Sequence, residues 1–170
     1  MIKKLLPLAF IGLAVAGVLL VGAMGLNWYY NGNKPDQPIA FNHNLHIEKV
    51  GLECTHCHRY TDKSPQAGIP SVSICMGCHE SAAIDRPEVK KLRAFWERKE
   101  PIAWNKVHIQ PWHVRFTHKR HIKAGIECTH CHGEVKAMTT VRKVRTLEMG
   151  WCVSCHREKN APTDCLNCHK

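Results

Sequence analysis

The amino-acid sequence predicts a mainly α-helical chain with extensive irregular loops and very little β structure. Three observations carry this prediction. An uncharged apolar run, residues 5–26, has the length of a membrane-spanning helix. All ten cysteines fall in five copies of Cys-x-x-Cys-His. Residues 31–170 must hold all five copies, which leaves each copy room only for short helices and loops.

The N-terminal segment, residues 1–30, is predicted to be a retained signal anchor. Its apolar run of about 22 residues, at about 1.5 Å per residue, would span about 33 Å, close to the hydrocarbon thickness of a bilayer. The alternative is a cleaved signal peptide, whose apolar core is shorter and ends in an A-x-A-like site. No such site follows the run. Lys3 and Lys4 place the N-terminus in the cytoplasm and the chain after Tyr30 outside it.

The five cysteine motifs are numbered here in chain order. Motif 1 spans 54–58, motif 2 spans 75–79, motif 3 spans 128–132, motif 4 spans 152–156 and motif 5 spans 165–169. Their cysteines are Cys54, Cys57, Cys75, Cys78, Cys128, Cys131, Cys152, Cys155, Cys165 and Cys168, and their histidines are His58, His79, His132, His156 and His169.

This spacing is typical of covalently attached c-type haem. Each of the two thiols forms a thioether to one vinyl group, and the imidazole that follows becomes the proximal ligand of the iron. A structural zinc site would need two such pairs, and five pairs do not divide that way. A disulfide framework gives no reason for a histidine after every second cysteine. The sequence therefore predicts five haem c groups.

A repeat organises the region after the anchor. Phe-x-His-x-x-His occurs at 41–46 and again at 116–121, each time shortly before Gly-x-Glu-Cys-Thr-His-Cys-His. The spacer between the histidine pair and the motif is shorter by a single position in the second copy. We therefore expect a two-haem module at 31–84, a connecting helix and loop at 85–112, and a three-haem module at 113–170. Within the connection, Asp85 as N-cap and Pro101 as terminator bound a predicted helix.

The net charge of +10 would by itself suggest a polyanionic partner. Five haems, however, bring about two propionates each, or roughly ten negative charges, which this basicity offsets. We therefore expect no nucleic-acid site. Because so few residues accompany each motif, the haems themselves are expected to supply most of the apolar interior.

The repeated histidine pair resembles that of the class III multihaem cytochromes c of the periplasm, where the same segment precedes the first haem motif. The resemblance implies a class III-like multihaem cytochrome c domain after the transmembrane helix. In that family the first histidine of the pair binds the haem of the following motif and the second binds the next haem. It thus implies four distal iron ligands: His43 for motif 1, His46 for motif 2, His118 for motif 3 and His121 for motif 4.

The distal ligand of the fifth haem is less evident from the sequence. Three-haem relatives take it from a histidine shortly before the second motif of their module, at a position held here by Glu148. His108, His113 and Met149 remain as candidates, and we favour His108. Methionine would raise the potential of that haem relative to a pair of histidines.

Residues 100–121 and 147–157, together with the anchor and the five motifs, resemble the pentahaem cytochrome subunit of alternative complex III. That resemblance implies a place in the bacterial cytoplasmic (inner) membrane, with a single pass and the haem domain on the periplasmic side. It implies three kinds of neighbour besides the membrane: an iron-sulfur protein of the molybdopterin-enzyme type, polytopic quinol-binding subunits and a monohaem cytochrome c. Electrons from quinol would leave for a periplasmic carrier or a terminal oxidase.

Two ligands on every iron would leave no open position for a substrate, so we expect no enzyme activity from the chain by itself. Three alternatives stay open. The first is the similar multihaem subunit of menaquinone reductase complexes, although that subunit usually carries six haems. The second is a stand-alone anchored quinol dehydrogenase, although proteins of that kind lack the duplicated histidine segment. The third is a catalytic multihaem reductase, which would need one iron with a free distal side.

Overall fold

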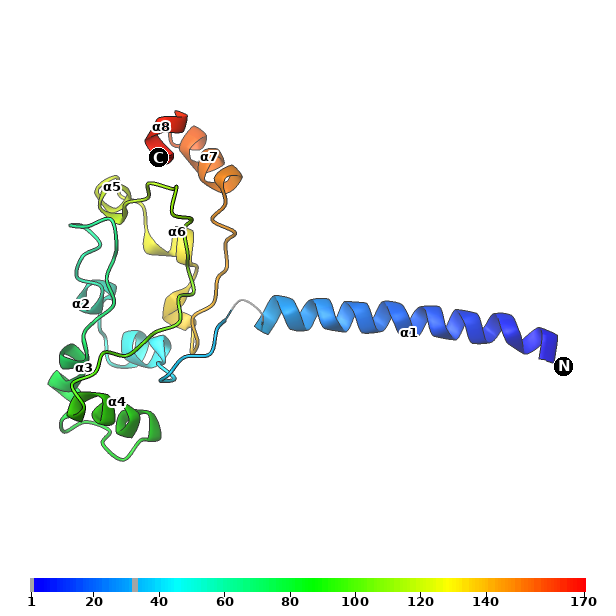
Figure 1. Ribbon diagram of the computed structural model, residues 1–170, viewed down its shortest axis with the longest axis horizontal. Helices are drawn as coiled ribbons and strands as arrows, with labels where there is room; N and C mark the ends of the chain where they lie inside the picture. The colour runs from blue at the N-terminus through cyan, green and yellow to red at the C-terminus, as the bar shows by residue number, and fades with distance from the viewer. Residues whose placement is uncertain (1, 32–33) are drawn as a thin grey trace. The chain divides into compact units, whose positions relative to one another are not determined.

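The structure is a computed structural model that describes the backbone of residues 2–31 and 34–170 and the side chains of residues 10–28 and 34–170. The chain divides into two compact units, Met1–Lys34 and Pro35–Lys170. The first unit is built on one long helix, and the second combines short helices with loops (Figure 1).

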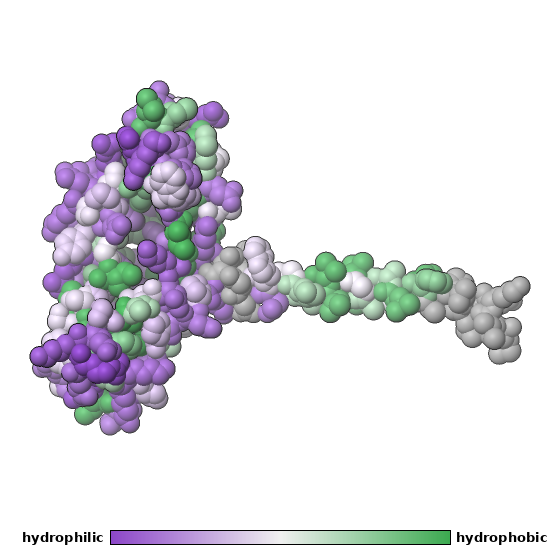
Figure 2. All heavy atoms as spheres, viewed as in Figure 1, coloured by the Kyte–Doolittle hydropathy of each residue, from purple (hydrophilic) through white to green (hydrophobic). Residues whose placement is uncertain are grey.

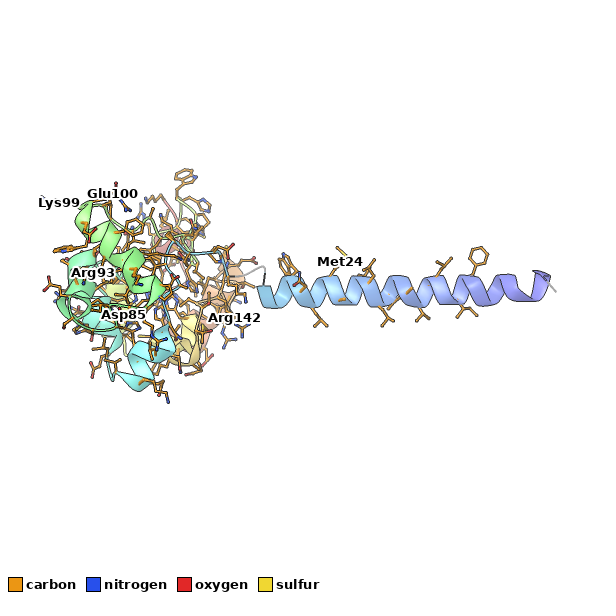
Figure 3. The ribbon with its side chains drawn as sticks, turned by 90° about the horizontal axis from the view of Figure 1, so that it is seen from below. Met24, Asp85, Arg93, Lys99, Glu100 and Arg142 are labelled. Carbon is orange, nitrogen blue, oxygen red and sulfur yellow. The ribbon has the colours of Figure 1, made fainter. Side chains whose placement is uncertain are left out.

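Helix α1, Ile2–Asn31, forms the first unit. Within it the segment Phe10–Trp28 has a mean hydropathy of 2.1, and all its side chains are exposed. Apolar side chains such as Met24 project from the helix above and below its axis (Figure 3), and Figure 2 shows a mainly hydrophobic surface over the coloured part of the helix. A helix that is apolar all round and unburied is compatible with a membrane anchor, as the sequence predicts.

The second unit contains short helices placed along a looping chain. They are η1 (Leu45–Lys49), α2 (Cys54–Cys57), α3 (Val72–His79), α4 (Pro87–Glu97), α5 (His118–Lys123), α6 (Cys128–His132), η2 (Val135–Ala137), α7 (Met149–Glu158) and α8 (Cys165–Cys168). Each of the five motifs lies on one of them: α2, α3, α6, α7 and α8. One helical turn brings both cysteines of a motif to the same side of its helix, as two thioether bonds to one haem would require.

The only side-chain core among the described residues gathers around α3 and α4. Ile39, Met76 and Leu92 are buried there, and Phe95 and Trp104 pack against them. Arg93 of α4, labelled in Figure 3, donates hydrogen bonds to the carbonyls of His79 (3.4 Å) and Glu80 (3.1 Å) and so holds the end of α3. The apolar stripe of the connecting helix thus fixes the second motif.

The connecting helix differs slightly from its prediction. It begins at Pro87 with Arg86 at the N-cap position, so Asp85 does not cap it. Proline at the first helical position has the helical φ already fixed and needs no hydrogen-bond partner for its nitrogen. The helix ends before Pro101 because Lys99 has a φ of 56° and the amide of Glu100 donates back to the carbonyl of Phe95.

These features confirm the predicted fold class: a helical chain with long loops and one apolar N-terminal helix. Within residues 2–31 and 34–170 the only β interaction is an isolated antiparallel bridge between Val114 and His169. That bridge has a role in the site described next.

Candidate haem-binding site

The first histidine pair is positioned by Phe41. The ring of Phe41 stacks on His46 with centroids 4.3 Å apart and meets His43 edge-on at 4.7 Å. The Nδ1 atom of His46 lies 2.8 Å from the carbonyl oxygen of Asn42. One aromatic ring therefore sets the orientation of both imidazoles, which point in different directions.

The second pair repeats this geometry around Phe116. Its ring lies 4.8 Å from both His118 and His121, edge-on to the first and tilted to the second. The Nδ1 atom of His121 lies 2.9 Å from the carbonyl oxygen of Thr117, the counterpart of Asn42. The sequence repeat is thus a repeat of local structure.

Three of the predicted distal histidines face the histidine of a motif. The ring centroids are 6.1 Å apart for His46 and His79, 6.2 Å for His118 and His132, and 6.0 Å for His121 and His156. These are the pairs that the resemblance implies for motifs 2, 3 and 4. For motif 1, His43 and His58 lie close enough to interact electrostatically.

These separations fit an iron held between two imidazoles. An imidazole nitrogen binds a transition metal at about 2 Å and lies about 1.1 Å from its ring centre, so two rings on opposite sides of one metal have centroids about 6.2 Å apart. Direct ring stacking would bring the centroids closer. The three pairs are therefore spaced as axial ligands of a metal.

Backbone carbonyls select the tautomer that this ligation needs. A carbonyl oxygen only accepts, so each Nδ1 within hydrogen-bond distance of one carries the hydrogen and leaves Nε2 with a free lone pair. Six motif or pair histidines have this contact: His46, His58 (Gly68 O, 2.6 Å), His79 (Ala82 O, 3.0 Å), His118 (Pro65 O, 2.9 Å), His121 and His156 (Pro162 O, 2.6 Å). Such bonds also fix the ring orientation of metal-binding histidines.

Motif 5 has His113 beside it. The ring centroids of His113 and His169 are 5.7 Å apart with an interplanar angle of 21°. The bridge between Val114 and His169 brings the two segments of chain together, and the amide of Lys170 donates to the carbonyl of His113 at 3.0 Å. Met149, at the start of α7, is largely exposed.

His108, the residue favoured from the sequence, lies elsewhere. Its ring meets that of His132 of motif 3 edge-on, with centroids 4.5 Å apart, which is too close for an iron between them. The structure therefore brings His113 to motif 5 and His108 to motif 3. The sequence contains no local signal for this, because His113 and His169 are distant along the chain and meet only through the tertiary bridge.

Two buried ring nitrogens have no hydrogen-bond partner, Nδ1 of His43 and Nε2 of His108. Burial, followed by the neighbouring His58 and His46, lowers the pKa of His43 to about 4. Burial also lowers the pKa of His132 to about 4, with His108 as the next cause. These imidazoles are neutral at physiological pH, the state in which histidine binds a metal.

All ten cysteines are free thiols. Together with facing imidazoles and a small side-chain core, the free thiols fit covalently attached haem: attachment through thioethers, axial ligands on both faces, and an interior that the macrocycles fill. A disulfide framework accounts for neither the facing pairs nor their carbonyl contacts, and a tetrahedral zinc site would not leave five pairs of cysteines each followed by a histidine.

Comparison with known proteins gives three similarities. Residues 29–105 match the family described as Class III cytochrome C, and residues 114–170 match Cytochrome c7 and related cytochrome c. The chain is also 29% identical to the protein named "Menaquinone reductase, multiheme cytochrome c subunit" of Nitratidesulfovibrio vulgaris (Hildenborough). That alignment of 188 residues covers 95% of this chain and 88% of the relative. The findings support a multihaem cytochrome c that binds haem c and takes part in electron transport.

Proposed function

We propose that the chain is a pentahaem electron conductor, with one haem c on each motif and two protein ligands on each iron. The observation that carries the proposal is the set of facing imidazoles, three pairs of which have ring centroids 6.0–6.2 Å apart. When bound, c-type haem supplies an iron that takes up and gives off one electron. The thioether cysteines hold each group, and the motif histidines bind from the proximal side.

The geometry of the facing rings supports the proposed distal ligands. His43, His46, His118 and His121 serve motifs 1 to 4, as the resemblance implies. His113 serves motif 5 in place of His108, because its ring is the one beside His169. Met149 is disfavoured because its side chain is 66% exposed. With imidazole on both faces, each iron is closed to substrates, so the chain's own residues bind, orient and insulate and do no bond chemistry.

Membrane location and orientation belong to the same proposal. The apolar helix α1 anchors the chain in the bacterial inner membrane, with Lys3 and Lys4 on the cytoplasmic side and the haem domain on the periplasmic side. The conductor then stands where quinol-linked electrons cross from the membrane to periplasmic carriers.

The conductor works as one subunit of a quinone-linked membrane complex. Two complexes are candidates. Its resemblance to the pentahaem subunit favours alternative complex III, with the iron-sulfur, polytopic and monohaem partners named above. The curated relative, a menaquinone reductase subunit similar along most of both chains, favours a complex in which electrons run toward menaquinone.

Gentle extraction of native membranes, purification through a tag on this chain and identification of the co-purifying proteins test this proposal. Polytopic subunits and an iron-sulfur protein are expected in either case. A monohaem cytochrome c and menaquinol oxidation by the purified complex would favour alternative complex III. Menaquinone reduction by a reduced periplasmic cytochrome would favour the reductase. Recovery of the chain alone with quinol oxidation of its own would contradict the proposal.

A further inference from the structure

We propose that the five haem sites form one unbranched row in the order motif 2, motif 1, motif 3, motif 4, motif 5. Motifs 2 and 5 are then the ends at which electrons enter and leave. The junction between motifs 1 and 3 is the step that every electron must cross. The inference rests on the proposed function, since it assigns the path within the same conductor. It also differs from the simplest expectation, in which the row follows chain order.

The first argument is that the two repeats hold each other reciprocally. The amide of Asn44, in the first histidine segment, donates to the carbonyl of Met138 in the loop after motif 3, at 3.0 Å. The amide of Lys119, in the second segment, donates to the carbonyl of Ser64 in the loop after motif 1, at 3.2 Å. Lys119 is the counterpart of Asn44, since each follows the first histidine of its pair, and Met138 is the counterpart of Ser64 when the two motifs are aligned.

Exchanging the halves therefore turns one hydrogen bond into the other. A contact with this property is the intrachain equivalent of a twofold, isologous interface, in which equivalent surfaces meet. Neighbouring bonds strengthen the contact: the Asn44 side-chain amide donates to Lys136 O at 3.1 Å, and the His118 amide donates to Pro65 O at 3.0 Å. The first motifs of the two halves are thus expected at the centre.

Motifs 1 and 3 do meet there. One loop, residues 64–68, contacts histidines of both haem sites. Its Gly68 carbonyl accepts from His58 of motif 1. Its Pro65 carbonyl accepts from His118, which faces the histidine of motif 3. The side chains of Cys54 and Cys128 also lie within hydrogen-bonding and electrostatic reach of each other. Cys54 and Cys128 are equivalent residues of the two repeats.

Motifs 2 and 4 lie on either side of this centre, and in each half a phenylalanine orients the histidine pair that links two motifs. Phe41 orients His43 toward motif 1 and His46 toward His79 of motif 2, and Phe116 does the same for motifs 3 and 4. A direct contact also joins motifs 3 and 4, since His130 Nε2 lies 3.4 Å from Cys155 Sγ.

Motif 5 continues the row beyond motif 4. Helix α8 begins shortly after α7 ends, and the side chains of Cys152 and Cys168 lie close enough to interact electrostatically. Figure 1 shows the resulting succession α3, α2, α6, α7, α8 from the bottom of the domain to its top. Along such a row each transfer oxidises the site it leaves and reduces the next. A quinol or quinone site and a one-electron redox protein serve as the external donor and acceptor.

The test compares haem deletions in the haem-loaded full chain. Replacing both cysteines of a motif by serine removes its haem, and the midpoint potentials of the remaining haems report which neighbours lost an interacting charge. Deleting motif 2 (Cys75→Ser with Cys78→Ser) or motif 5 (Cys165→Ser with Cys168→Ser) should shift one remaining potential. Deleting motif 1 (Cys54→Ser with Cys57→Ser) should shift two. If loss of motif 2 shifted two potentials and loss of motif 1 only one, the proposed order would be overturned and the haems would follow chain order.

A second measurement needs no variant. Anomalous scattering at the iron edge locates the irons in the intact chain or in whatever complex contains it. Motif 1 between motifs 2 and 3 is the expected result, and any other neighbour would overturn the row. Iron positions are independent of the quinone partner, so this result and the co-purification result can fail separately.

Discussion

A histidine that binds a metal through Nε2 carries a hydrogen on Nδ1, and this hydrogen is usually donated to a nearby acceptor. In this chain backbone carbonyl oxygens are the acceptors. Six imidazoles lie 2.6–3.0 Å from a carbonyl oxygen through Nδ1. The acceptors come from turns and loops next to the motifs, such as Gly68 and Pro162. The irregular loops are therefore part of the site, because they fix the tautomer and the ring direction before any metal arrives.

The assignment of His113 is tested by substituting it and its competitor. His113→Ala should remove the distal ligand of motif 5 and convert one of the low-spin ferric irons to high spin, visible in the ferric electron paramagnetic resonance (EPR) spectrum. The reduced variant should also bind carbon monoxide at that one iron, since a coordination position is then open.

His108→Ala is the matched control, because both residues lie in the stretch of chain between motif 2 and motif 3. It should leave every iron low-spin. A high-spin iron in His108→Ala and none in His113→Ala would return the ligand to His108. Met149→Ala should likewise leave the spectrum unchanged.

At the scale of elements, α3 and α4 are the helices, among those described, that pack on each other through a side-chain core. Leu92 is 6% exposed and packs with Ile39 and Met76 in the cluster beside motif 2. Elsewhere the short helices contribute few buried side chains of their own. The helix that follows motif 2 thus packs against the only side-chain core among the described residues.

Leu92→Ala should lower the free energy of unfolding by about 2–3 kcal/mol, because it leaves a cavity in a small cluster. Lys90→Ala, an exposed change on the same helix, should alter it by less than about 0.5 kcal/mol. Denaturant unfolding of the haem-loaded chain, followed by far-ultraviolet circular dichroism, measures both. Equal effects of the two substitutions would show that the cluster does not stabilise the domain.

Glu88 links α4 to the segment that precedes the first histidine pair. Its Oε2 accepts the amide hydrogen of Ala40 at 2.6 Å, and its Oε1 pairs with Lys91 Nζ at 2.7 Å. Hydrogen bonds from Lys91 and then from Ala40 hold the pKa of Glu88 below its usual value of 4.5. The carboxylate therefore contributes stability that is complete above pH 4.5 and is lost as the pH falls through the lowered pKa.

Glu88→Gln should reduce the loss of stability that the protein shows as the pH falls through the pKa of Glu88. The amide oxygen still accepts from Ala40, so the loss at neutral pH should stay under about 1 kcal/mol. The free energies of unfolding of wild type and variant should converge as the pH falls below 4.5. Urea unfolding at a series of pH values measures them. Glu97→Gln, on the same helix, serves as the control. Parallel curves for wild type and Glu88→Gln would contradict the role of the carboxylate.

At the scale of the whole molecule, the local elements of the domain can be predicted from the sequence, but the contacts between distant segments cannot. Motif spacing and the duplicated histidine segment predict helical turns that carry the thiols, and the structure confirms a helical domain with long loops. The pairing of His113 with His169 and the reciprocal bonds of Asn44 and Lys119 have no local pattern, because each joins segments that are distant along the chain. Ligation of the irons stays a prediction of the facing rings.

The central claim is that five irons are each closed on both faces by this chain. The most direct test is the EPR spectrum of the oxidised, haem-loaded full chain, integrated against its total iron. The account predicts five low-spin ferric irons per chain and no high-spin signal. A high-spin fraction of one iron or more in the unmodified chain, or fewer than five irons in total, would contradict it.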